Sequence, residues 1–158
     1  QAKIKITRTT RTGETRTILF APVALTGSVS EIIPAENQIF QECFIVAINS
    51  EDEATTTGIG KSTFRLPFTF QILEARASVK SAPEGSSILV DVNRNGLSIF
   101  TDQLEIPGGS KTSQDALVLP TFSTSTLADD SEISIDVDQV GSSSPGSGLK
   151  VYLSGRRG

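Results

Sequence analysis

Short stretches of alternating apolar and polar residues, separated by turn residues, recur along the chain from Ser62 onward. They follow one another at spacings of roughly 8 to 12 residues. No stretch repeats its apolar residues with the period of an amphipathic helix. Because alternation places apolar side chains on one face of a strand, the pattern predicts an all-β chain. Its expected fold is an antiparallel β-sandwich or jelly roll with an extended N-terminal arm.

The alternation also predicts the individual strands. In chain order they are TFRLPFTFQI, LEARASVK, SILVDV, LSIFT, QLEI, ALVLP, EISIDVDQV and LKVYLSG. The segments between them, such as APEG, NRNG, PGGSKTS and GSSSPGSG, contain the Gly, Pro and Asn residues that turns require. The final GRRG is predicted to be a frayed basic tail.

Three regions are expected: a basic arm at 1–20, a strand-rich connecting segment at 21–61, and the sandwich domain at 62–158. The arm contains two strand patterns, AKIKITRT and TRTILF, on either side of a turn at Thr12 and Gly13. The connecting segment includes SVSEIIPAENQ, a short strand broken by Pro34, and ends in the exposed loop SEDEATTTGIGKS. It also includes IFQECFIVAIN, whose apolar residues occupy both faces. That pattern predicts a buried central strand.

The chain's one cysteine, Cys43, lies in this apolar run, so we expect a buried structural thiol. The chain contains no His, no Met and no Trp. A Ser–His–Asp or Cys–His catalytic site and a His/Cys zinc site are therefore excluded, and we expect neither an enzyme nor a cofactor. Aromatic residues are scarce, which disfavours binding of sugars or nucleic acid. No apolar run approaches the roughly 18 to 20 residues of a membrane span.

Charge separates the arm from the rest of the chain. Residues 1–20 contain five basic residues and one acidic residue, whereas the whole chain has a net charge of −4. Such asymmetry indicates a docking arm, or else a solvated terminus. The stretch ADDSEISIDVDQVG (128–141) holds five acidic residues. Three interpretations are open for it: a solvated strand face, a surface for basic groups, or a cation site formed by Asp136 and Asp138 with Asp129 or Asp130. The candidate docking residues are Lys3, Ile4, Lys5, Ile6, Arg8, Arg11, Arg16, Asp136 and Asp138.

One motif has the spacing of a calcium-binding loop. In DVNRNGLSIFTD the ligands would be Asp91, Asn93, Asn95 and Asp102. The flanking segments are strand-like rather than helical, and Asn95-Gly96 is a strong signal for a two-residue hairpin turn. We therefore predict a hairpin and no metal site.

Much of the predicted sandwich resembles a small β domain of virion proteins from cyanophages and other marine phages. The resemblance covers about residues 62–154 and includes FRLPF, the Ala-Pro turn, the NG hairpin and the block ADDSEISIDVDQVG. It implies a non-enzymatic structural role in a phage particle and a homotrimeric assembly. It implies no catalytic residues, and it does not cover residues 1–61.

The chain is too short to include the shaft of a fibre, so a small body with a docking arm suggests a capsid decoration or cement protein. Its expected partners are further copies of itself and the major capsid protein or another virion protein, with no nucleic acid and no membrane. The expected location is the surface of the virion. Two alternatives remain: a tail or fibre-tip module that binds the host surface, and a carboxylate-based glycan hydrolase.

Overall fold

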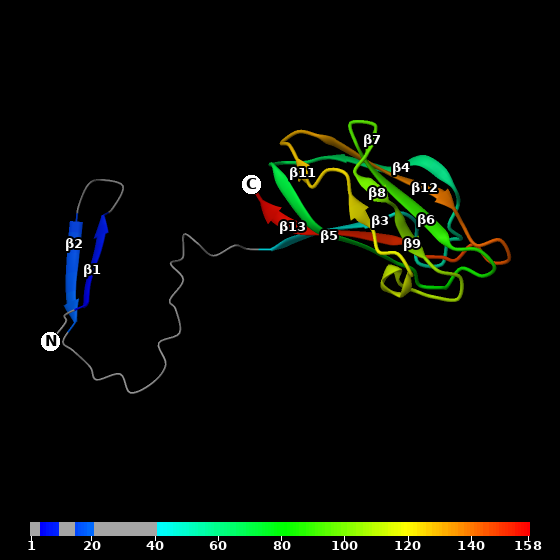
Figure 1. Ribbon diagram of the computed structural model, residues 1–158, viewed down its shortest axis with the longest axis horizontal. Coiled ribbons are helices and arrows are strands. Elements are labelled where there is room, and N and C mark those ends of the chain that lie inside the picture. Colours follow the sequence, from blue (N-terminus) through cyan, green and yellow to red (C-terminus); the bar gives the residue numbers. More distant parts are fainter. Residues whose placement is uncertain (1–3, 10–14, 21–40) are drawn as a thin grey trace. The chain divides into compact units, whose positions relative to one another are not determined.

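The computed structural model describes residues 4–9, 15–20 and 41–158 (Figure 1). The chain forms two compact units, residues 1–38 and residues 39–158. In the first unit, β1 (Ile4–Thr9) pairs antiparallel with β2 (Thr15–Phe20), which confirms both strands predicted in the arm. The candidate docking residues Lys3 and Arg11 lie outside the described residues, as do the turn at Thr12 and Gly13 and the strand predicted around Pro34.

The second unit is built from two antiparallel sheets, drawn in Figure 1 as two layers. The first sheet has the order β11-β5-β13-β3, and the second has the order β4-β12-β6-β7 with β9 also paired to β6. A short ribbon of β8 and β10 lies beside them. The bounds are β3 Glu42–Ala47, β4 Gly58–Arg65, β5 Phe70–Ser78, β6 Ile88–Arg94, β7 Leu97–Ser98, β8 Phe100–Asp102, β9 Leu104–Ile106, the 3-10 helix η2 Ser113–Asp115, β10 Thr121–Phe122, β11 Thr126–Leu127, β12 Glu132–Gln139 and β13 Lys150–Arg157.

The alternating residues of the central strands form the core between the sheets. Ile133, Ile135 and Val137 of β12 are buried, as are Val151 and Leu153 of β13. Each fully buried side chain of this size stabilises the fold by about 1.5–3 kcal/mol. The predicted antiparallel β-sandwich is therefore confirmed, whereas a jelly-roll connection of its strands stays a prediction.

The predicted hairpin at Asn95-Gly96 is confirmed. The two residues have φ of 51° and 80°, and they join β6 to β7 with Arg94 opposite Leu97. A two-residue turn with both central φ positive has the twist that suits a hairpin, and Asn and Gly tolerate that conformation best. Asn95 is thus a turn residue, and its side-chain oxygen accepts a hydrogen bond from Glu132 N.

The prediction of a buried central strand at IFQECFIVAIN is wrong. Its strand, β3, lies at the edge of the first sheet and pairs only with β13 among the described strands. Phe44 and Val46 pack against the core, while Cys43 is exposed and 63% of Ile45 is accessible to solvent. Apolar residues on both faces of a strand do not bury both faces when only one face has a partner layer.

The sandwich also begins earlier than predicted. β3 and the first residues of β4 belong to it, so the boundary at Ser62 between a connecting segment and the sandwich domain is misplaced. The predicted strand TFRLPFTFQI is divided, because its first half ends β4 in one sheet and its second half begins β5 in the other. The connection contains Pro67, which cannot donate a ladder hydrogen bond.

Two further predictions near the surface are wrong. ALVLP is not a strand but a loop that follows η2. GRRG is not a frayed tail, because β13 continues through Arg156 and Arg157. The guanidinium of Arg157 lies 3.8 Å from the centroid of the Phe68 ring and pairs with Glu42 at 2.7 Å, so packing holds this end of the chain in place.

Candidate functional site

A groove forms where β8 leaves the second sheet. β6 pairs first with β9, up to Val90 opposite Leu104, and then with β7, starting at Asn93 opposite Ser98. Between these two paired positions β6 has only two residues, 91 and 92, whereas the neighbouring segment has five, 99–103. The longer segment bows outward, and its β8 portion pairs with β10 instead. This departure from the ladder opens the hollow.

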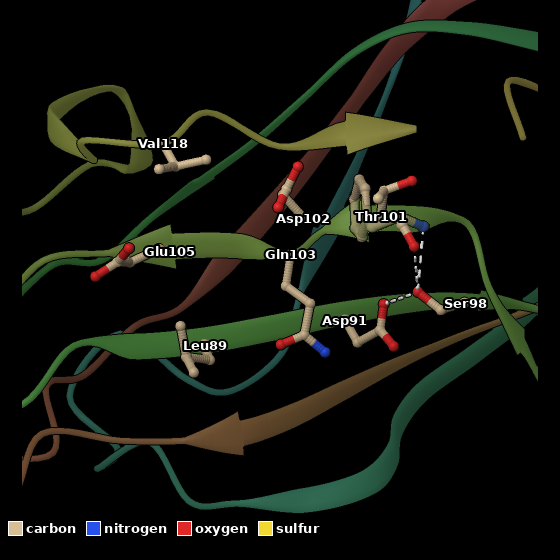
Figure 2. Close-up of a pocket in the computed structure, with 9 residues that line it drawn as sticks. Leu89, Asp91, Ser98, Thr101, Asp102, Gln103, Glu105 and Val118 are labelled. Carbon is tan, nitrogen blue, oxygen red and sulfur yellow. Dashed lines mark hydrogen bonds between the residues drawn. The ribbon is translucent and has the colours of Figure 1, made fainter. Parts of the chain in front are cut away.

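The groove encloses about 490 Å³, and carboxylates dominate its charged groups (Figure 2). Asp91 comes from β6, Asp102 from the end of β8 and Glu105 from β9. Figure 2 also shows Val118, which belongs to the loop after η2. The remaining lining residues are Leu89, Ser98, Phe100, Thr101 and Gln103.

Asp91 has a structural task at the point where the ladder is interrupted. Its Oδ1 accepts hydrogen bonds from Val92 N at 2.8 Å and from Ser98 Oγ at 2.7 Å. Ser98 Oγ in turn accepts from Phe100 N at 3.1 Å. Because an unpaired buried donor is costly, Asp91 stabilises the corner from which β8 departs.

The other carboxylates at the groove each accept one hydrogen bond from a neutral neighbour. Thr121 Oγ1 donates to Asp102 at 2.5 Å, and Ser87 Oγ donates to Glu105 at 2.6 Å. Gln103 Nε2, on the groove wall, donates to Asp138 at 2.8 Å. A carboxylate has acceptor capacity for further donors, so these groups can receive a ligand without losing their present partners.

The groove carboxylates are not neutralised by cations of the sandwich unit. Within residues 41–158, Arg65 forms ion pairs with Asp130 and Glu132. The other ion pairs in this range are Arg76–Glu74, Lys80–Asp52, Lys150–Glu51 and Arg157–Glu42. None of these pairs involves a groove carboxylate. These residues contain nine basic and fifteen acidic residues. The groove therefore carries uncompensated negative charge in this part of the chain.

The two acidic residues predicted for docking differ in role. Asp136 Oδ1 accepts a hydrogen bond from Gly60 N at 2.7 Å, and Oδ2 accepts one from Asn93 Nδ2 at 2.9 Å. Gly60, with φ of 61°, lies in an irregularity of β4, where the register against β12 shifts. Asp136 thus stabilises this irregularity. Asp138, by contrast, is exposed, and it lies beside the groove because it accepts a hydrogen bond from Gln103 of the groove wall.

The five described docking residues of the arm belong to its two-stranded ribbon. Ile4, Lys5, Ile6 and Arg8 are in β1, and Arg16 is in β2 directly opposite Arg8. Of the predicted docking residues, the structure thus places Arg8 and Arg16 directly opposite each other in the ribbon. Asp136 and Asp138 have different hydrogen-bond partners in the sandwich.

The loop Leu117–Val118–Leu119 borders the groove through Val118, although the sequence predicts a strand at ALVLP. Leu117 is fully exposed, and Val118 and Leu119 are 57% and 51% exposed. Two features of the sequence argue against a strand here: the apolar residues are consecutive rather than alternating, and Pro120 follows them directly.

Comparisons of the chain with protein-family models, with characterised proteins and with solved structures find no match. Across the ranges that the structure describes, no three or more Asp, Glu or Cys side chains group in a way that could hold a metal ion. No helix in those ranges is both long and apolar enough to cross a membrane.

Proposed function

We propose that this chain is a non-enzymatic structural protein of a phage virion, a capsid decoration or cement protein that attaches through its N-terminal arm and oligomerises on the particle. One observation carries the proposal: the chain forms two compact units, of which the first contains a basic two-stranded ribbon and the second is an acidic β-sandwich. A compact body combined with a small charged ribbon suits attachment to a preformed surface. The resemblance of residues 62–154 to phage virion domains supports the same role.

The energetics of the arm favour attachment. An isolated two-stranded ribbon is at best marginally stable in water and needs a surface against which to pack. The register places Ile4 opposite Phe20 and Ile6 opposite Ile18, so the ribbon offers two neighbouring apolar pairs for such a surface. Trimeric assembly would present three arms together, and their combined binding would exceed that of one arm.

The tail or fibre-tip module is the second candidate, and the exposed loop Leu117–Leu119 favours it. An apolar loop at the surface suits contact with a receptor as well as contact with another virion protein. The number of copies per particle separates the two roles, because a decoration protein covers the capsid in hundreds of copies whereas a tail module is present in tens or fewer.

The test is to purify particles of the phage that encodes the chain and to quantify this protein against the major capsid protein by mass spectrometry. Hundreds of copies per particle, with density on the capsid in electron micrographs, would support the decoration role. Tens of copies or fewer, on the tail, would favour the second candidate. Absence of the chain from purified particles would overturn the structural role altogether.

A further inference from the structure

The loop Leu117–Leu119 follows a short turn that hydrogen bonds fix to the sandwich. Ser113, at the start of η2, is fully buried, and its Oγ accepts a hydrogen bond from Ala77 N at 2.9 Å. Ala116 N donates to Ser113 O at 3.3 Å, which closes the turn directly before Leu117. The three apolar side chains are therefore presented from a fixed support, and adjacent exposed apolar residues of this kind mark an interaction surface.

Apolar and acidic features meet at this loop. On one side Val118 lines the groove with Asp91, Asp102 and Glu105. On the other side Leu119 lines a smaller hollow of about 100 Å³ together with Leu73 and Phe122. We call the loop, the groove and this hollow the docking surface. Its ligand should combine apolar side chains with several positive charges.

The first 20 residues of the chain have this composition. They hold five basic residues against one acidic residue, and their ribbon contains two neighbouring apolar pairs. The register also sets Arg8 directly opposite Arg16, an arrangement that is unfavourable for two like charges. In the sandwich unit, Asp91 of the groove is directly opposite Asp136. A contact between the two surfaces would bring these two like-charged pairs, of opposite sign, close to one another.

We propose that the docking surface receives residues 1–20 of a second copy of this chain. The inference deepens the proposed function, since it rests on attachment through the arm and names a neighbouring copy as one partner. The ribbon's apolar pairs cover Leu117, Val118 and Leu119, while its basic residues approach the groove carboxylates. Such an arm-to-groove contact is heterologous, and heterologous contacts produce closed rings when the rotation between copies closes. A trimer is the ring that we expect.

The experiment uses the full chain in sedimentation velocity at micromolar to tens of micromolar concentration. Leu117→Ser removes an apolar side chain from the docking surface and should weaken association by about tenfold or more. Leu97→Ser is the matched control, because Leu97 is 71% exposed on the β6–β7 hairpin, outside the docking surface. This control should change the association constant by less than about twofold. Equal effects of the two variants, or a wild-type chain that stays monomeric, would overturn the proposal.

A mixing experiment tests whether the occupant is a second copy. One full-length variant carries Arg8→Glu and Arg16→Glu, and the other carries Leu117→Ser. Each variant alone should associate poorly, but their mixture should form dimers, because the intact arm of one fits the intact docking surface of the other. If the arm instead occupies its own body, mixing restores nothing, and that result would overturn the proposal.

Charge is tested separately from apolar contact. Asp102→Asn retains an acceptor for Thr121 and should weaken association in low salt, with little effect in 1 M salt, where the screening length is only about 3 Å. Glu84→Gln, on an exposed loop elsewhere, is the control. Weakening by the control alone would overturn the proposal. A monomeric wild-type chain that is nevertheless present on particles would leave the proposed function standing, so the two failures are distinguishable.

Discussion

Asp136 and Asp138 occupy the same face of β12, yet their replacement should have very different consequences. Asp136→Ala removes the acceptor of two hydrogen bonds, from Gly60 N and from Asn93 Nδ2, and leaves the amide of the buried Asn93 without that partner. Asp138→Ala removes one hydrogen bond, donated by a surface glutamine. The first variant therefore disturbs the junction of β4, β6 and β12, whereas the second disturbs only the rim of the groove.

The magnitude follows from the geometry. A hydrogen bond to a charged group contributes about 1.5–3 kcal/mol when buried, and we take about 1 kcal/mol for each of these partly exposed bonds. Removing a like charge directly opposite Asp91 in the ladder returns about 0.2–1 kcal/mol. Asp136→Ala should thus lower the free energy of unfolding by about 1–2 kcal/mol. Asp138→Ala should stay within about 0.5 kcal/mol of the parent chain.

Urea denaturation of the full chain, followed by circular dichroism, measures both effects. Asp136→Asn should cost less than Asp136→Ala, since its amide oxygen still accepts from Gly60 N and the Asn93 amide can turn to accept from its nitrogen. A double-mutant cycle with Asn93→Ala isolates the coupling between the two side chains. Equal destabilisation by Asp136→Ala and Asp138→Ala, or a coupling energy of zero, would refute this account of Asp136.

Three further outcomes are expected. Gly155→Ala should lower the free energy of unfolding, measured in urea, by about 2–3 kcal/mol, because an added Cβ would lie 2.1 Å from Gln71 O. Gly96→Ala is the comparison, since its Cβ would meet nothing within 4 Å. It should cost only the roughly 1–2 kcal/mol of a left-handed backbone conformation. The melting temperature should be the same in chelator and in millimolar calcium, since Asp91 and Asn95 already serve the corner and the turn, whereas calcium at 100 times its dissociation constant would add about 2.7 kcal/mol. Cys43 should react with a thiol reagent in the native state as completely as in urea, and protection of the native thiol would contradict its exposed position on β3.

The sequence predicted those features that depend on local pattern. Alternation gave the inward row of Ile133, Ile135 and Val137, and the positive φ required by a two-residue turn identified Asn95-Gly96. The order of strands within a sheet is not local. An apolar run such as that of β3 therefore looked central, although it lies at an edge with Ile45 exposed.

The candidate site was predictable only in part. Negative charge near β12 was visible in the sequence, but the groove depends on the departure of β8 from β6, which no periodicity records. The loop Leu117–Leu119 was mistaken for a strand because its residue types suit a core, and the sequence does not show whether a partner strand is available. Asp136 looked like a surface charge, since its bond with Gly60 joins residues 76 positions apart in the chain.

The register shift in β5 has a consequence for how this chain can change in length. Ile72 is opposite Gly155 and Glu74 is opposite Ser154, so Leu73 is an extra residue without a partner in the ladder. Phe70 and Ile72 face the core before it, and Ala75 and Ala77 face the core after it. A single-residue deletion in a strand ordinarily moves every later side chain to the opposite face of the sheet. Deletion of Leu73 would instead restore unbroken alternation of the four core residues, so the sandwich can lose one residue here while the hollow beside Leu119 loses part of its wall.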